Sequence, residues 1–371
     1  MYQLFFSLVL RRVSPERAHA LATSALRLAI RMPPTRALIG RLVGGTPGCL
    51  QVQALGLTFP TPLGVAAGLD KSATWFQELG ALGFGFVEVG TVTPQPQDGN
   101  PPPRLVRLVR DRALVNKMGF PNAGAEVVAK ELSVRERRPV VGVNIGKSMS
   151  VPLDEAAGDY RAVVRRLAPM ADYLALNVSS PNTPGLRELQ NPDLLRALVT
   201  DVRAELAAIS CRRPLLLKVS PDLDDPQLTA LAELAIELSV EGIIAVNTTV
   251  DRTGLRDPDA ASIEGGGVSG PPLRGKALSA LRCLRLAAGD RLVLISVGGV
   301  ASADDVWERI LAGATLVQAY TAFVYGGPAW PARVNRELAH KVRAAGAHSV
   351  GALVGTGGSA APTATGTGQR R

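Results

Sequence analysis

The chain has 371 residues, of which 46% are hydrophobic and only 4% aromatic, and its formal net charge is +9. This length suits one large α/β domain or two ordinary ones, and the shortage of aromatic side chains argues against a surface that stacks nucleic-acid bases. The three cysteines, Cys49, Cys211 and Cys283, are too far apart in sequence for a metal-binding spacing or a disulfide framework.

The first 45 residues are predicted to form an amphipathic helical extension. Residues 1–50 contain seven arginines and one acidic residue, Glu16, so +6 of the net charge lies there. Apolar residues recur at helical spacing, in Leu4, Phe5, Leu8 and Val9 and then, beyond Pro15, in Leu21, Ala25 and Leu28. Arginines opposite an apolar face suit a helix on a membrane surface; two core-docked helices with solvated arginines are the alternative. The opening apolar run of about 10 residues is too short to span a bilayer, which takes about 20.

Eight short apolar runs between residues 62 and 325 have the continuous, β-branched composition of strands that are buried on both faces. The runs are PLGVAAG, FVEVGTV, VVGVNIG, YLALNVSS, LLLKVSP, GIIAVNTT, LVLISVGG and TLVQAYTAF. Helical patterns separate most of them, so residues 46–345 are predicted to fold as an α/β (β/α)8 TIM barrel, with a doubly wound sheet as the alternative. The string GGGVSG fits G-x-G-x-x-G, but no strand precedes it and Pro271 follows it, so a glycine-rich loop is expected there.

Polar residues end six of these runs, at the level where active sites of this fold lie. They are Asp70–Lys71, Thr91, Asn144, Ser180, Lys218–Ser220 and Asn247–Thr248. Each could simply mark a strand end, but that explains less well why two lysines and, with Asn177, three asparagines share one level. The last two runs lead into Gly298–Gly299 and Tyr320–Thr321, whose backbone amides, with Gly270, suit a phosphate group; ordinary turn glycines are the alternative.

The other polar residues at this face are amides and hydroxyls, and asparagine amides can match the edges of a uracil-like or flavin-like ring. The sequence has no convincing carboxylate pair and no H-x-H motif, so no metal is expected, and His19, His340 and His348 lie outside the barrel. Histidine base chemistry is therefore not expected. These observations favour a flavin, which carries its own redox chemistry, assisted by a weak protein base such as serine.

A series of motifs along residues 14–327 resembles the dihydroorotate dehydrogenase family. The motifs are AAGLDK, GTVTPxPQxGNPxPRLxRL, NxMGFxNxG, NIGK, NxSSPNTPGLR, VNTTxDR, GGxSGxPL, SVGGV and QxYTAFxYxGP. The resemblance implies a barrel that binds flavin mononucleotide (FMN) and oxidises (S)-dihydroorotate to orotate in de novo pyrimidine (UMP) biosynthesis. Members linked to fumarate or NAD carry cysteine where Ser180 stands and lack the extension. The serine and the extension resemble the quinone-linked class, which implies a membrane quinone as partner and peripheral attachment to the cytoplasmic side of the cell (inner) membrane.

The resemblance also implies roles for matching residues. Ser180 would remove the proton from C5 of dihydroorotate, and Lys218 would lie by the N1–O2 edge of the flavin. The expected FMN contacts are Ala67, Gly68, Leu69, Asp70, Lys71, Thr91, Asn144, Asn177, Lys218, Val246, Gly270, Gly299, Tyr320 and Thr321. The expected substrate contacts are Lys71, Asn116, Lys117, Met118, Gly119, Phe120, Asn177, Asn182, Asn247 and Thr248. Val246 and Lys117 depart from the family pattern, in which threonine and arginine are frequent at these positions.

Several alternatives stay open at this point. His19 and Arg107 resemble polar residues of a quinone path, although a helix-surface histidine and a solvated arginine would explain them as well. Residues 346–371 are rich in Gly, Ala, Ser and Thr without periodicity, which predicts a flexible low-complexity tail. The rival functions are a phosphate-binding lyase or isomerase without flavin and a membrane adaptor that uses the barrel as a scaffold. The oligomeric state is not determined by the sequence, with a monomer among the options.

Overall fold

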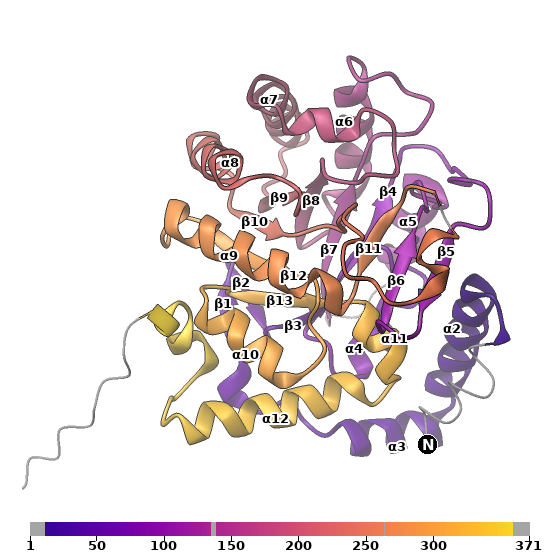
Figure 1. The fold of residues 1–371 in the computed structure, drawn as a ribbon, viewed down its shortest axis with the longest axis vertical. Coiled ribbons are helices and arrows are strands. Elements are labelled where there is room, and N and C mark those ends of the chain that lie inside the picture. The colour runs from indigo at the N-terminus through magenta and orange to yellow at the C-terminus, as the bar shows by residue number, and fades with distance from the viewer. Residues whose placement is uncertain (1–11, 135–138, 263, 359–371) are drawn as a thin grey trace, which may run out of the picture.

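The computed structural model of the chain describes residues 12–134, 139–262 and 264–358 (Figure 1). Within them, eight parallel strands close into a barrel, which confirms the predicted fold. In order around the barrel they are β3 (Leu63–Val65), β4 (Phe86–Val92), β7 (Val140–Ile145), β8 (Tyr173–Asn177), β9 (Leu215–Val219), β10 (Gly242–Ala245), β12 (Val293–Val297) and β13 (Leu316–Ala319). The ring closes where Val317 of β13 lies opposite Leu63 of β3.

Helices surround the barrel and cover the outer faces of its strands, as Figure 1 shows. They are α4 (Phe76–Ala81), α5 (Gly124–Ser133), α6 (Ala156–Leu167), α7 (Pro192–Ala208), α8 (Asp225–Glu237), α9 (Arg274–Ala288), α10 (Ala303–Leu311), α11 (Thr321–Gly326) and α12 (Trp330–Ala344). All residues of β4, β8, β9 and β10 are buried, because one face of each strand lies inside the barrel and the other under the helices. Capping boxes that begin at Asp224 and Ser302 fix the starts of α8 and α10.

A small antiparallel sheet lies beside the barrel and corrects the sequence prediction for GGGVSG. It consists of β5 (Leu105–Leu108), β6 (Ala113–Asn116) and β11 (Gly267–Ser269), in the order β11-β6-β5. The glycine-rich segment is therefore not wholly a loop, because Gly267 to Ser269 pair with Asn116 to Leu114. A Cβ at Gly267 would lie 1.9 Å from the Thr248 hydroxyl oxygen, so glycine lets this strand approach the end of the β10 loop.

The C-terminal segment packs on the barrel further than expected. Two 3₁₀ turns, Val350–Leu353 and Thr356–Gly358, follow α12, and Val350 is buried. The Gly355 amide donates to the carbonyl of Ile310 at 3.0 Å. The ordered barrel domain thus extends beyond residue 345, because a few apolar side chains dock a segment whose composition alone predicts no fold. Residues 359–371 of the predicted tail lie outside the described residues.

The N-terminal extension contributes α2 (Pro15–Arg31) and α3 (Pro33–Val43), which pack along one side of the barrel (Figure 1). Glu16 forms an ion pair with Arg104 at 2.7 Å, and Arg107 donates to the Val13 carbonyl at 2.8 Å, so α2 is attached to the β5 region. Leu21 and Leu28 remain 63% and 64% exposed. None of the described helices is long and apolar enough to cross a membrane. The apolar residues Leu4 to Val9 lie outside the described residues.

Candidate active site

A pocket opens at the C-terminal ends of the barrel strands and encloses about 1110 Å³ not filled by atoms, its open mouth included. The sequence-predicted residues that line it are Ala67, Gly68, Lys71, Thr91, Asn116, Met118, Gly119, Phe120, Asn177, Ser180, Asn182, Lys218, Val246, Asn247, Thr248, Gly270, Gly299, Tyr320 and Thr321. No acidic side chain and no histidine is among the described residues that line it, which disfavours the lyase or isomerase alternative.

Four sequence-predicted residues lie outside this lining. Leu69 is buried in the barrel core, and the Lys117 side chain is exposed. Asp70 turns its carboxylate toward the backbone, where its oxygens accept from the amides of Thr74 (2.8 Å) and Trp75 (3.0 Å). Asn144 lies under the lining and accepts a hydrogen bond from the Thr91 hydroxyl at 2.6 Å. Asp70 and Asn144 therefore hold residues next to the pocket in place and do not line the pocket themselves.

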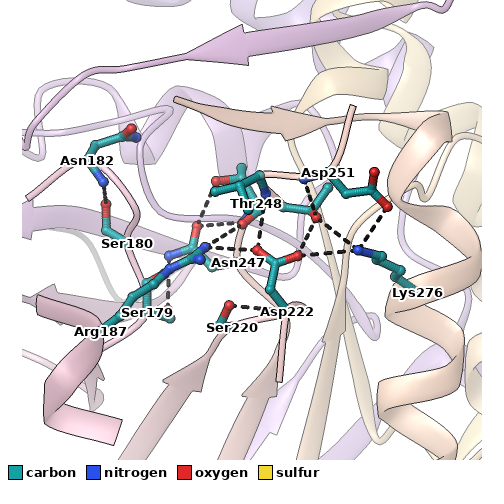
Figure 2. Close-up of polar contacts among 12 residues, drawn as sticks. Ser179, Ser180, Asn182, Arg187, Ser220, Asp222, Asn247, Thr248, Asp251 and Lys276 are labelled. Atoms are coloured by element: carbon teal, nitrogen blue, oxygen red, sulfur yellow. Dashed lines mark hydrogen bonds and ion pairs between the residues drawn. The ribbon is translucent and has the colours of Figure 1, made fainter. Parts of the chain in front are cut away.

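The structure distinguishes two adjacent serines that sequence periodicity cannot. Ser180 lines the pocket, and its Oγ accepts from the Asn182 amide at 3.2 Å in the turn that follows β8. The hydroxyl of Ser179 points elsewhere: it donates to Asn177 Oδ1 at 3.2 Å and accepts from Asn247 Nδ2 at 3.0 Å. Figure 2 shows Ser180 and Asn182 apart from the network that holds Ser179. Ser180 is thus the serine available to a ligand.

Amide side chains from the ends of β6 and β8 and from the loops that follow β8 and β10 converge beside Ser180. The Asn182 side chain donates to Asn116 Oδ1 at 3.1 Å, and Asn247 donates to Asn177 Oδ1 at 3.3 Å. The Oδ1 of Asn182 is buried without a hydrogen-bond partner among the described residues. A buried acceptor left without a donor is costly, so this oxygen points to an N–H group on a ligand.

A polar layer inside the barrel forms the floor of the pocket, where Lys218 and Gln318 line it and Glu88 lies below them. The carboxylate of Glu88, on β4, forms an ion pair with Lys218 at 3.3 Å and accepts from Gln318 Nε2 at 2.7 Å. The other amide atom, Gln318 Oε1, is buried and has no partner in the described part of the chain. The sequence analysis did not single out Glu88 or Gln318, although an acid inside the buried run FVEVGTV was a signal.

Glycines at the far end of the pocket allow close backbone approach. Gly299 has φ +73°, and a Cβ built on it would lie 2.5 Å from the Arg274 Cα. Gly270 has φ +96°, and a Cβ there would lie 2.9 Å from the Arg112 carbonyl oxygen. Beside Gly270, the Thr321 and Ser269 hydroxyls lie 2.8 Å apart. Backbone amides and hydroxyls without an acid form a suitable environment for a phosphate group.

Burial controls the charges at the rim nearest α2. Desolvation lowers the pKa of Lys71 from its usual value, while Glu16 and Asp70 act in the opposite direction. Burial, with the charge of Lys71 as a smaller cause, lowers the pKa of His19 to about 4, and the His19 ring packs edge-on against Trp75 at 5.5 Å. His19 is therefore neutral near pH 7, and Lys71 is the lysine on this rim of the pocket.

Arg187, which the sequence analysis did not single out, connects three loops behind Ser180 (Figure 2). Its guanidinium donates to the carbonyls of Ser179 (3.1 Å) and Thr248 (3.3 Å) and pairs with Asp222 at 3.1 Å. Asp222 also accepts from the Val250 amide at 3.1 Å. The loops that follow β8, β9 and β10 are therefore held in one arrangement by a single arginine.

Comparisons with known proteins agree with this geometry. A family model described as dihydroorotate dehydrogenase matches residues 49–342. "Dihydroorotate dehydrogenase (quinone)" from Rhodococcus opacus strain B4 is 51% identical over 359 residues, covering 96% of this chain and 99% of the relative. The protein of the same name from Mycobacterium tuberculosis H37Rv is 48% identical over 344 residues, covering 93% and 95%. The crystal structure of DHODH from Eimeria tenella in complex with ferulenol has a TM-score of 0.86 at 35% identity, covering 97% and 99%.

Proposed function

The chain belongs to the dihydroorotate dehydrogenase family, and on this premise we propose that it oxidises (S)-dihydroorotate to orotate in pyrimidine biosynthesis, with a quinone as electron acceptor. The observation that carries the proposal is the convergence of Ser180, a set of asparagine amides and Lys71 on one pocket free of acids among the described residues. Orotate and dihydroorotate are anionic and carry amide edges. Cationic and amide side chains recognise these features directly.

We propose FMN as the cofactor, because the residues present fit it. Packing requires the glycines at 270 and 299, because a Cβ at either position would collide with the protein. Both glycines line the pocket, where their bare backbone amides suit a phosphate. The orphaned acceptor Gln318 Oε1 and the cation Lys218 suit a ring that offers an N–H group and gains negative charge. When bound, the flavin supplies the two-electron chemistry that no side chain of the pocket provides.

Ser180 would act as the base at C5 of the substrate. A serine hydroxyl is a weak base, so its own proton would pass to water as it takes the C5 proton, and the negative charge that develops on its oxygen needs stabilisation. The Asn182 amide donates to this Oγ at 3.2 Å, and donation to the charged form favours it. The Asn182 and Asn116 side chains, which hold one another at 3.1 Å, would orient the pyrimidine amide edge. Asn247 would act from the opposite loop, held by Asn177.

We propose that α2 guides the quinone and rests on the cytoplasmic side of the cell membrane. Its exposed Leu21 and Leu28 lie one above the other at i, i+7 and suit the apolar face of an interfacial helix. His19, which is neutral because burial lowers its pKa to about 4, lies near Lys71 at the pocket rim. A neutral polar side chain between the apolar helix and the pocket suits the carbonyl head of a quinone.

The experiment that tests the reaction compares Ser180→Ala with Ser179→Ala in FMN-loaded protein. Flavin bleaching by dihydroorotate, followed by stopped-flow absorbance, should slow by about 10²–10⁴-fold in Ser180→Ala, the typical contribution of a general base. Ser179→Ala should lose less, since Ser179 contacts other side chains. Equal losses in both variants, or a protein that takes up no FMN, would refute the assignment. Steady-state assays with quinone, fumarate and NAD as rival acceptors test the proposed acceptor.

A further inference from the structure

Glu88 is the most enclosed acidic group in the barrel. It lies in the middle of β4, and its relative exposure is 0%. One carboxylate oxygen accepts from Asn144 Nδ2 (2.8 Å) and contacts Lys218 Nζ (3.3 Å). The other accepts from the Tyr173 hydroxyl (3.3 Å) and Gln318 Nε2 (2.7 Å). Donors from four other strands of the barrel, β7, β8, β9 and β13, therefore meet at this one carboxylate.

Such a group is not explained by stability. The interior of a TIM barrel is normally filled by branched apolar side chains. Taking a carboxylate and an ammonium out of water costs several kcal/mol per ion, and apolar residues of similar volume are often at least as stable as a buried ion pair. An ion pair kept at the centre of a barrel, directly beneath a ligand pocket, calls for a role in that pocket.

The link between Glu88 and the pocket is Lys218. Lys218 lines the pocket floor with its side chain only 5% exposed, and Glu88 is the carboxylate with which it pairs. Glu88 itself does not line the pocket. The carboxylate can therefore influence a bound ring in two ways, by fixing the position of the ammonium and by offsetting part of its positive charge.

We propose that Glu88 is a positioning residue that holds Lys218 against the flavin and sets the reduction potential of the bound FMN. The inference rests on the proposed function, because it requires FMN in this pocket. Two-electron reduction brings negative charge to the ring, and Lys218 stabilises that charge. Glu88 opposes it through its own charge, so the pair adjusts the driving force between dihydroorotate and quinone. A lysine alone would favour the reduced state more strongly and hinder the transfer of electrons to the quinone.

The sign of each charge change follows from Coulomb's law. Glu88→Gln keeps the size of the side chain and removes the negative charge, so the FMN should become easier to reduce by about tenfold in the equilibrium constant. For a two-electron couple that factor equals a rise of about 30 mV. Lys218→Gln leaves Glu88 unpaired and should shift the equilibrium in the opposite direction. The neutral double variant Glu88→Gln/Lys218→Gln should lie between the two single variants.

The measurement is the redox equilibrium of full-length, FMN-loaded protein with a dye of known potential, followed by absorbance. Two controls separate charge from packing. Glu205→Gln removes a buried carboxylate on α7 that pairs with Arg165 outside the barrel. The equilibrium constant for FMN reduction should therefore stay within about twofold of the wild-type value. Tyr173→Phe removes one donor to Glu88 without changing a charge and should have a similarly small effect.

The outcomes separate this inference from the proposed function. FMN uptake by the wild-type protein, with a higher potential in Glu88→Gln, supports the inference. FMN uptake with an unchanged or lower potential overturns it and leaves the proposed function intact, whereas a wild-type protein that binds no FMN overturns both. Should Glu88→Gln fail to fold, the double variant is compared with Lys218→Gln. A potential in the double variant no higher than in Lys218→Gln overturns the inference.

Discussion

Gly299→Ala is the substitution whose cost can be worked out most directly from the structure. At φ +73° a side chain costs about 1–2 kcal/mol. The new Cβ would lie 2.5 Å from Cα, 2.6 Å from Cβ and 2.7 Å from N of Arg274, so the two backbones must separate by about 1 Å. Overpacking of this kind typically costs about 1–3 kcal/mol. We therefore expect a loss of about 2–5 kcal/mol in the free energy of unfolding.

The same displacement should weaken FMN binding, because it moves the amides that the phosphate would contact. The assays are urea unfolding of the FMN-saturated protein and FMN titration by fluorescence quenching. Gly275→Ala is the matched control on α9, since a Cβ there meets nothing within 4 Å. This variant should leave FMN affinity unchanged and should not lower the free energy of unfolding. If Gly299→Ala unfolds at the same urea concentration as the wild type, the packing argument is wrong. If it binds FMN as tightly as the wild type, the phosphate does not lie at Gly299.

Three further predictions concern Arg187, which connects three loops behind Ser180, then Asp70 near the pocket rim, and then α2. Arg187→Gln should slow flavin reduction by dihydroorotate about 10–100-fold, because it loosens the loop that carries Ser180. The control Arg196→Gln, at an exposed ion pair, should change neither the rate nor the free energy of unfolding appreciably. Equal rates in the two variants would refute the role of Arg187 in holding the three loops. Burial raises the pKa of Asp70 from 3.8 to about 6, so the folded state binds this proton more tightly than the unfolded state. As the pH falls from 7 to 4, the free energy of unfolding of the wild type should therefore rise by up to about 3 kcal/mol relative to Asp70→Asn, measured by urea unfolding. A pH-independent difference would contradict that reasoning. Leu21→Ser with Leu28→Ser should reduce flotation with anionic lipid vesicles at least about tenfold, and unchanged flotation would exclude α2 as the membrane contact.

The barrel could be predicted because its strands are buried on both faces, which leaves continuous apolar runs in the sequence. The residues at the ends of those runs could be predicted as lining for the same reason, since a parallel barrel gathers all its C-terminal strand ends at one face. Ser180, Lys218 and Asn247 reach the pocket in this way. Gly299 could be predicted because it is a glycine, whose lack of a side chain leaves the backbone amides accessible to a ligand.

Residues that act from beneath or behind the lining were beyond such reasoning. Arg187 is an unremarkable arginine in sequence, and its role depends on three carbonyl and carboxylate groups that only folding brings together. Asn144 ends a strand as Thr91 does, yet it faces Glu88 inside the barrel and does not line the pocket. The docked turns at 350–358 depend on a few apolar contacts within a glycine-rich segment that has no periodicity, and composition alone does not predict such contacts.

The distribution of charge around the pocket connects these observations. Two lysines, Lys71 and Lys218, line it, and the acids that accompany them, Glu16, Asp70 and Glu88, all lie outside the lining. The proposed anionic ligands would therefore meet lysines first, and no carboxylate of the described lining would compete with them for the donors of the pocket. Of these acids, Glu88 pairs with Lys218, and Glu16 and Asp70 act on Lys71 through their charge. With part of the positive charge offset in this way, the binding of two anions would not require a strongly positive cavity that would hold its product too tightly. Specificity is thus determined by the residues of the lining, and the strength of the electrostatic field by the residues behind it.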